Sequence, residues 1–236
     1  MISGEEAAAI IVDRDAPVVY IDTCSLLDLV RGTRDNFTSD CANAAVHILK
    51  LAEDKKITIV IPEQVITEFN SNIGETRLSG ARSIGFLNDR LNQMRGTLQA
   101  YGIQIPFIEE FSQEAYIAAA DNVIERFIAT SITNTSTVEA QSKAAQRVLI
   151  GKAPAASAKQ SFKDCLVLES CYETLEVARR NNFGKTAHFL SANTQEYANE
   201  AKRRLHPGLV DEFNALNMEY SINFLELRYS NSIKDI

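Results

Sequence analysis

Short runs of apolar residues alternate with longer stretches of helical periodicity along this chain. The runs at 17–21 and 57–61 are rich in β-branched residues and end at a polar residue or a proline, which is typical of strands buried on both faces of a parallel sheet. We expect further strands at 187–190 and near 219–222, and the segment 103–106 is another candidate.

Helical patterns fill the intervals between these runs. Helices are predicted over 24–31, 39–54, 75–101, 112–130, 137–149, 161–180 and 195–205. Pro62 fits the first turn of one more helix, where no amide hydrogen is missed. Strands that alternate with helices predict an α/β fold, a three-layer α/β/α sandwich around a mainly parallel central sheet.

The domain organisation expected from these patterns is simple. Residues 1–16 are predicted to be a loosely held lead-in, and residues 17–236 a single domain with a helical insertion at about 76–150. The length of 236 residues and the hydrophobic content of 45% suit one sizeable core and argue against disorder.

Charge and composition narrow the functional classes. The longest apolar runs, 7–12 and 115–120, are far shorter than the roughly 20 residues of a membrane span. The acidic start of the chain is unlike a signal peptide, so we expect a cytoplasmic protein with no membrane partner. The net charge of −7 argues against nucleic-acid binding by bulk charge but leaves a local basic surface open. No two of the four cysteines have CxxC spacing, and the three histidines are scattered, so a zinc site is not predicted.

Carboxylates follow the predicted strands at the points where ligands bind in such sheets. Asp22 comes directly after the first run, and Glu68 lies about two helical turns beyond the second. Asp164 opens the helix at 161–180, and Glu196 follows the strand at 187–190. Four converging carboxylates would repel one another unless a cation joined them. Oxygen ligands of this kind suit Mg²⁺ or Mn²⁺, which can promote phosphodiester cleavage.

Four motifs in this order resemble the PIN (PilT N-terminus) domain family. They are VYIDT at 19–23, IPEQVITEF at 61–69, SFKD at 161–164 and FLSANTQEY at 189–197. The resemblance covers roughly 17–75 and 155–200. It implies an α/β/α sandwich and a Mg²⁺- or Mn²⁺-dependent nuclease of the PIN type that cuts single-stranded RNA.

The resemblance also implies roles for individual residues. Asp22, Glu68 and Asp164 would be the catalytic carboxylates that bind the metal. Thr23 and Ser191 would supply hydroxyls that orient those carboxylates or the substrate. Many PIN enzymes have Asp where this chain has Asn193, which can ligate a metal through its amide oxygen but brings no charge. Glu196 would then replace the lost charge.

A basic segment precedes Asp164. Residues 140–163 contain no Asp or Glu but five basic residues, Lys143, Arg147, Lys152, Lys159 and Lys163. We expect Lys152, Lys159 and Lys163 to contact substrate phosphates, in contacts that salt would weaken. A solvated helix face followed by a loop is the alternative interpretation.

Structural interpretations compete with each of these functional ones. Asp22 and Asn193 could simply cap helices, and Glu68 and Asp164 could be helix-surface charges. The acids Asp28, Glu63 and Glu169 are expected at the surface or the rim of the site.

Other enzyme classes fit the sequence less well. A dehalogenase-type phosphatase needs a second Asp two residues after Asp22, where this chain has Cys24, and a dinucleotide-binding turn needs glycines that are missing there. The main alternative is therefore a catalytically inactive PIN-like module that binds RNA or protein. The helical insertion could shape a substrate groove, mediate homo-oligomerisation or receive a protein inhibitor. The nuclease could serve as an endoribonuclease toxin, in defence or in RNA processing.

Overall fold

The structure is a computed structural model that describes residues 1–32, 37–104, 109–155, 161–199, 201 and 204–236. Its centre is a sheet of five parallel strands in the order β3-β2-β1-β4-β5. The strands are β1 (Val18–Ile21), β2 (Thr58–Pro62), β3 (Ile132–Asn134), β4 (Ala187–Leu190) and β5 (Met218–Ser221). Each residue of β1, β2 and β4 is buried, as expected for strands covered on both faces.

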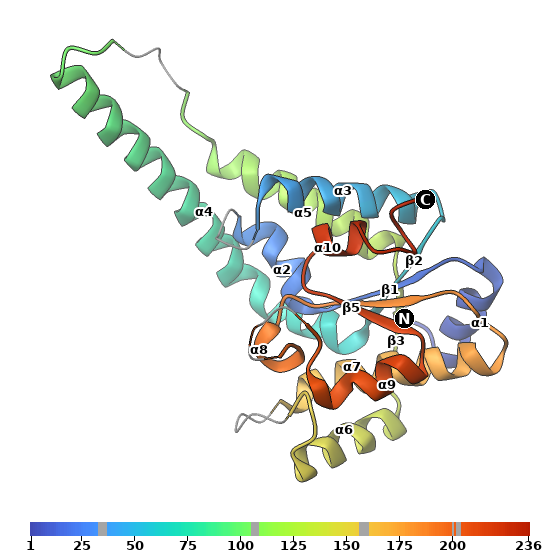
Figure 1. The fold of residues 1–236 in the computed structure, drawn as a ribbon. Helices are drawn as coiled ribbons and strands as arrows, with labels where there is room; N and C mark the ends of the chain where they lie inside the picture. The colour runs from blue at the N-terminus through green and yellow to red at the C-terminus, as the bar shows by residue number, and fades with distance from the viewer. Residues whose placement is uncertain (33–36, 105–108, 156–160, 200, 202–203) are drawn as a thin grey trace.

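Helices cover both faces of this sheet and complete the predicted α/β/α sandwich (Figure 1). They are α1 (Gly4–Arg14), α2 (Thr23–Arg31), α3 (Ser39–Glu53), α4 (Glu63–Ala100), α5 (Gln113–Thr130), α6 (Val138–Ile150), α7 (Phe162–Arg180), α8 (Thr194–Tyr197), the 3₁₀ helix η1 (Pro207–Leu209), α9 (Val210–Ala215) and α10 (Phe224–Arg228). The helices α1, α7 and α9 lie on one side of the sheet, and α3, α5 and α10 lie on the other (Figure 1). Among the described residues, none of the helices combines the length and the apolar character that crossing a membrane requires.

The N-terminal segment differs from the loosely held lead-in that the sequence predicted for residues 1–16. Residues Gly4–Arg14 form α1, which packs against α7 and buries Ala7, Ala8 and Ile11. A capping box starts the helix, because Ser3 accepts a hydrogen bond from the Glu6 amide while Glu6 accepts one from the Ser3 amide. The segment is thus part of the sandwich.

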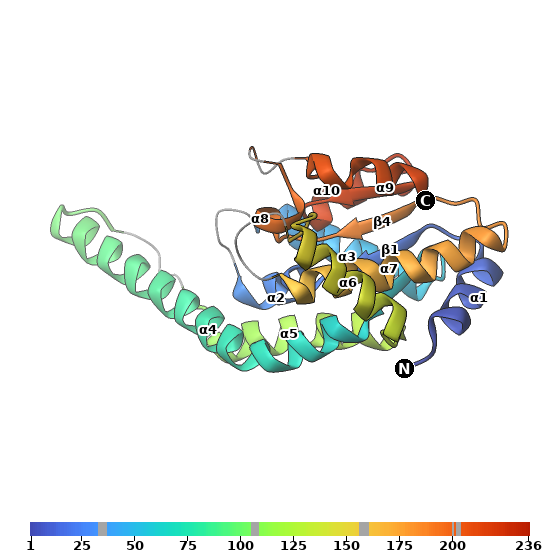
Figure 2. The ribbon, with the colours of Figure 1, turned by 90° about the horizontal axis from the view of Figure 1, so that it is seen from below.

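Residues 76–150 are only partly an insertion. The helix α4 runs without a break from Glu63 to Ala100, and its second half projects from the sandwich (Figures 1 and 2). The same stretch contains β3, which pairs with β2 at the edge of the central sheet, and α6, which packs against α7. The prediction of a helical insertion was therefore wrong for the part that builds the sheet.

Two local predictions also need correction. Residues 103 and 104 are not a strand, and the rest of the strand predicted at 103–106 lies outside the described residues. The helix predicted over 195–205 is a single turn, α8, after which Ala198 forms an isolated antiparallel bridge with Leu205. By contrast, the strand predicted at 187–190 has the bounds of β4, and Pro62 ends β2 and precedes the first turn of α4.

The strand order distinguishes the carboxyl end of β1 from the other strand ends. The chain runs from β1 to β2 on one side, whereas β4 joins β1 on the other. Helices that follow neighbouring strands therefore leave in different directions at the carboxyl end of β1, which is where open α/β sheets bind ligands. The candidate site lies at this end.

Candidate active site

Asp22 is the first residue after β1 and the residue before α2. Its backbone amide donates to the Leu190 carbonyl of β4, which continues the sheet by one step and fixes the position of the carboxylate. Only 3% of Asp22 is exposed. Its side chain does not cap α2 in the usual way, although backbone hydrogen bonding from Thr23 and Cys24 lowers its pKa.

Ser191 instead holds the Asp22 carboxylate. The Ser191 hydroxyl donates to Asp22 Oδ2 at 2.7 Å and accepts a hydrogen bond from the Asn193 amide at 3.1 Å. The Tyr220 hydroxyl donates to the Ser191 carbonyl, and this contact ties β5 to the same loop. Of the two roles that the sequence left open for Ser191, the structure shows a contact with a carboxylate, that of Asp22.

Glu68 reaches the site from the second turn of α4. The Thr23 hydroxyl donates to Glu68 Oε2 at 3.1 Å, and the Gln64 amide donates to Glu68 Oε1 at 3.2 Å. The ammonium group of Lys163 lies 3.8 Å from Glu68 Oε1, on a side chain that is 70% exposed. Glu68 is thus oriented from two sides and is not a solvated residue of the helix surface.

Asp164 lies in the first turn of α7, where the helix dipole favours a negative charge. The Asn193 side-chain amide donates to Asp164 Oδ1 at 3.0 Å, and the Tyr197 hydroxyl donates to the Asp164 carbonyl at 3.0 Å. Asn193 precedes α8 as predicted, but its side chain makes no capping hydrogen bond. Its amide nitrogen faces Asp164 instead.

The acids of the site lie close enough to shift the pKa values of one another. Burial, opposed by the Ser191 hydrogen bond, raises the pKa of Asp22 to about 6, and the charge of Glu68 adds to this rise. Burial and, after it, the charges of Asp22, Glu196 and Glu68 together raise the pKa of Asp164 to about 7. Negative charge therefore exceeds positive charge at the carboxyl end of β1.

This charge balance bears on whether a cation fits. No three His, Cys, Asp or Glu side chains among the described residues form a ready-made metal-binding group. Sharing one ion would therefore require Asp22, Glu68 and Asp164 to move closer together. The donors nonetheless match a hard cation, since they are carboxylate oxygens whose mutual repulsion a bound Mg²⁺ or Mn²⁺ would remove. Glu196, which is 9% exposed, lies close enough to Asp164 to add to that repulsion.

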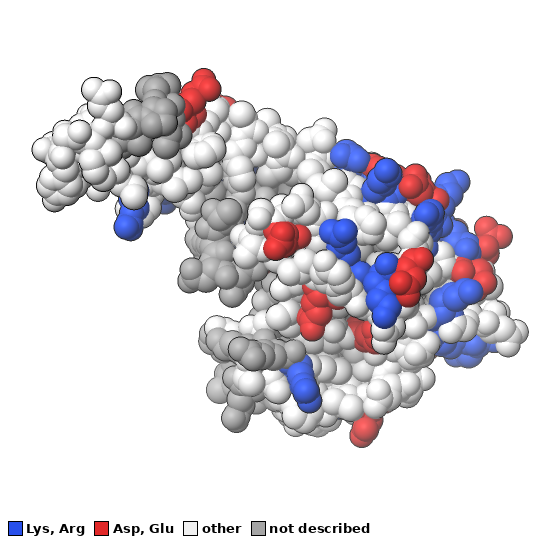
Figure 3. Space-filling model, turned by 45° about the horizontal axis from the view of Figure 1, so that its top comes forward, with Lys and Arg blue, Asp and Glu red and all other residues white. Residues whose placement is uncertain are grey.

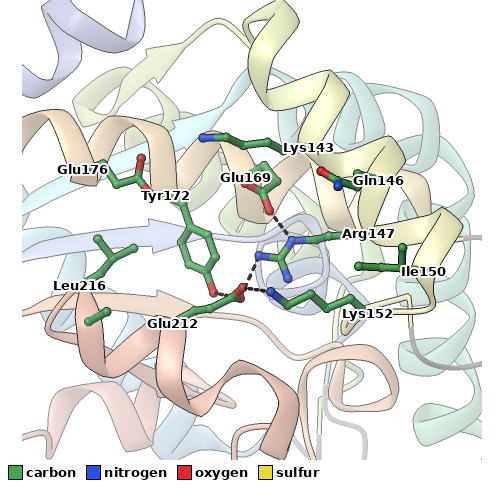
Figure 4. Close-up of a pocket in the computed structure, with 11 residues that line it drawn as sticks. Lys143, Gln146, Arg147, Ile150, Lys152, Glu169, Tyr172, Glu176, Glu212 and Leu216 are labelled. Atoms are coloured by element: carbon green, nitrogen blue, oxygen red, sulfur yellow. Dashed lines mark hydrogen bonds and ion pairs between the residues drawn. The ribbon is translucent and has the colours of Figure 1, made fainter.

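Several basic residues before Asp164 are engaged in ion pairs, and Figure 4 shows those of Arg147 and Lys152. Lys143 pairs with Glu139, and Lys152 pairs with Glu212. Arg147 is buried and contacts the carboxylates of Glu169 and Glu212. Lys159 lies outside the described residues. The predicted phosphate contact through Lys152 therefore competes with an existing ion pair, whereas Lys163 stays exposed beside Glu68.

The three acids assigned to the surface or rim behave differently from one another. Asp28 forms an ion pair with Arg31 within α2, as a surface residue does. Glu63 accepts a hydrogen bond from the Ser136 amide, just beyond β3. Glu169 is only 6% exposed and pairs with Arg147. The surface assignment of Glu169 was wrong because its cationic partner lies 22 residues earlier in the chain.

Two further polar residues, which the sequence motifs do not include, belong to the site. Ser25 donates to the Leu190 carbonyl and accepts from the Ala192 amide, which joins α2 to the loop after β4. Gln64 orients Glu68 from one helical turn earlier. The spacing of four residues between Gln64 and Glu68 was a usable signal, because such residues are neighbours on a helix face. The contact of Ser25 depends on residues 165 positions away.

Comparison with known proteins gives one match. A sequence model of the PIN domain family matches residues 19–197. This range covers more than half of the chain and includes Asp22, Glu68, Asp164 and Glu196 together with the stretch 76–150. No curated protein and no solved structure matches the chain.

Proposed function

Because the chain belongs to the PIN domain family, a family of nuclease type, we propose that it is a metal-dependent nuclease that hydrolyses phosphodiester bonds of single-stranded RNA. The observation that supports this proposal is the pair of acids at the carboxyl end of β1, of which Asp22 is buried and Asp164 is half-buried. Asp22 and Asp164 both have raised pKa values, and each is raised partly by other carboxylates of the site. Perturbed acids that gather at a ligand-binding edge are typical of catalytic sites.

Asp22, Glu68 and Asp164 would hold Mg²⁺ or Mn²⁺, with Asn193 and Glu196 at the margin of the ion. A divalent cation supplies polarisation of a phosphate oxygen and a bound water of lowered pKa. Glu196 would add negative charge, which the amide of Asn193 cannot.

The other residues of the site act on these carboxylates. Ser191 holds one oxygen of Asp22 through its hydroxyl and so orients the carboxylate. Thr23 fixes the rotamer of Glu68. Lys163 extends into solvent next to Glu68, where its ammonium group can meet a phosphate of the incoming strand. We propose the same phosphate contact for Lys159. We also propose that the protein acts in the cytoplasm, as expected from the sequence.

The test compares two variants that each remove one carboxylate from the first turn of a helix. Asp164→Asn removes the acid of the site, whereas Asp40→Asn removes an exposed acid from the first turn of α3. We expect the wild type and Asp40→Asn to cleave single-stranded RNA with added Mn²⁺ and to stop with a chelator. Asp164→Asn should lose at least about 100-fold in rate, since a metal-binding carboxylate supplies several kcal/mol of transition-state stabilisation.

One observation favours the alternative of an inactive PIN-like module. The side chain of Asn193 donates to Asp164 and so stabilises the site without a cation. Such a module would bind single-stranded RNA or a protein but leave RNA uncleaved at every Mn²⁺ concentration, and Asp164→Asn would not weaken its binding. Uncleaved RNA together with intact binding would therefore replace the nuclease proposal with this one.

A further inference from the structure

The second half of α4 forms an arm that projects from the sandwich. We define the arm as residues 82–104 and 109–112, that is, the distal part of α4 and the described parts of the segment that leads back to α5. Asn88 and the Phe111 backbone exchange two hydrogen bonds of 2.9 and 3.0 Å, and Asn92 donates to Glu110 at 2.8 Å. Figures 1 and 2 both show the arm extending beyond the other helices.

Apolar residues of α4, together with Tyr101 directly after its end, repeat along the arm with the spacing of a coiled coil. The repeat consists of Ile84, Leu87, Leu91, Met94, Leu98 and Tyr101. These positions alternate in steps of three and four residues, so they form one apolar stripe on the helix, which we call the seam. A stripe with this period is the pattern by which one helix packs into the side chains of another helix.

The distal seam lacks a helical partner among the described residues. The helix α5 reaches α4 near Gly85, where a Cβ atom would lie 2.9 Å from the side chain of Gln113, the first residue of α5. Beyond that point Met94 is 60% exposed and Tyr101 is 75% exposed. Of the sixteen exposed large hydrophobic residues in the described part of the chain, seven lie in the range from Leu78 to Phe111. This concentration exceeds the scattered apolar residues of an ordinary surface.

Charge on the arm favours a second copy of this chain as the partner. The arm has three basic residues, Arg82, Arg90 and Arg95, and three acidic residues, Asp89, Glu109 and Glu110. It is therefore neutral, although the whole chain has a net charge of −7. On the face shown in Figure 3 the arm is mainly white, and most charged side chains lie on the rest of the molecule. Two neutral arms can approach without the repulsion that two net-acidic sandwiches would impose.

The residues beside the seam also select an orientation. In a parallel pair, Arg90 would face the partner subunit's Arg95, since the positions that flank a heptad seam meet five residues apart. In an antiparallel pair centred between Leu91 and Met94, Arg90 is nearest to the partner subunit's Thr97. Like charges across a helix pair are destabilising, so the antiparallel arrangement is favoured.

We propose that two copies of this chain associate through the seams of their arms, as an antiparallel coiled coil with twofold symmetry. The seam from Ile84 to Tyr101 spans 18 residues, or about 27 Å of helix at 1.5 Å per residue. The twofold axis presents the same six side chains on both copies, as a symmetric dimer requires. This assembly is independent of catalysis, because the arm lies outside the acid site.

Analytical ultracentrifugation of the full chain over increasing concentration tests the proposal. We expect the wild type to approach twice its mass of 26.1 kDa. Met94→Glu places a charge in the seam. Gln93→Glu places the same charge on the preceding residue, which is exposed and lies outside the seam. Because the proposed dimer is symmetric, its interface contains each substitution twice. We therefore expect Met94→Glu to raise the dimer Kd about 100-fold, about tenfold per copy, and Gln93→Glu to change it less than about threefold.

Two outcomes would overturn the proposal. A wild type that sediments as a monomer at every concentration would exclude self-association through the arm. A dimer that Met94→Glu leaves intact would place the interface elsewhere on the chain. Since Met94 is exposed in the single chain, its substitution should preserve the fold, and an unchanged melting temperature of the monomer would verify this.

Discussion

The substitution Asp164→Asn should stabilise the metal-free protein at neutral and alkaline pH. The pKa of Asp164 is raised from 3.8 to about 7 by burial and by neighbouring carboxylates. An acid whose pKa is higher in the folded state binds more protons there than in the unfolded chain. Its contribution to stability is therefore present at low pH and is lost as the pH rises through the folded pKa.

The pKa shift of Asp164 sets the size of the stabilisation expected in Asp164→Asn. A change of about 3 pH units at about 1.4 kcal/mol per unit sets an upper limit of about 4 kcal/mol. Two effects oppose it in the variant. The lost charge at the start of α7 costs about 0.3–1 kcal/mol of helix-dipole stabilisation, and the hydrogen bond from Asn193 becomes one between neutral groups. We expect a net gain of about 2 kcal/mol in the free energy of unfolding above pH 7.

Urea denaturation in the presence of a chelator measures this gain at several pH values. The difference between Asp164→Asn and the wild type should shrink as the pH falls from about 7 toward 3.8, because the wild-type carboxyl group becomes protonated. Asp40→Asn, which changes an exposed acid in the first turn of another helix, should show no such trend. Excess Mn²⁺ should reverse the order, since only the wild type keeps the full set of ligands.

Two results would refute this reasoning. A variant less stable than the wild type above pH 7 without metal would mean that the Asp164 charge makes a net stabilising contact. A gain that does not depend on pH would mean that titration of Asp164 is not its cause.

Three further predictions follow from other contacts. Ser191→Ala removes the hydroxyl that lowers the pKa of Asp22, so the pH midpoint of Mn²⁺ binding, followed by calorimetry, should rise by about one unit. Burial lowers the pKa of His188 to about 4, so the wild type should lose up to about 3 kcal/mol between pH 6.5 and 4, and His188→Gln should flatten this slope in acid denaturation. Arg147→Met leaves a buried carboxylate unpaired and should cost about 3–5 kcal/mol in urea denaturation, whereas Lys143→Met, at an exposed pair, should cost less than about 1 kcal/mol.

The sheet could be predicted where its strands are marked locally. Two apolar runs predict both a strand and the point where it ends. One run ends at Asp22 and the other at Pro62. By contrast β3 has only three residues, and pairing with β2 rather than its own sequence makes it a strand. The helix α1 could have been found, because Ser3 and Glu6 form the spacing of a capping box before an alanine-rich turn.

The candidate site could be predicted for a different reason. Asp22, Glu68 and Glu196 come after strands, and parallel strands bring their carboxyl ends together, so topology converts positions far apart in the chain into neighbours. Asp164 reaches the same place from the first turn of α7. No comparable rule of topology predicts the partners of the basic residues at 140–163. The net positive charge of this segment is a property of 24 consecutive residues, yet Arg147 and Lys152 meet Glu212, which lies 60 or more residues later. Local charge in the sequence therefore overstated the free positive charge beside Asp164.

Asn193 links the departure from the family pattern to the stability of the site. An aspartate at this position would set a further carboxylate within hydrogen-bond distance of Asp164 and raise the pKa of Asp164 still more. The amide instead donates a hydrogen bond, which lowers that pKa. Yet Asp22 and Asp164 remain acids in a place where neutral residues would fold more easily. Retained carboxylates that oppose folding are what a cation-binding site requires, and for this reason the nuclease proposal explains the site better than a module that only binds.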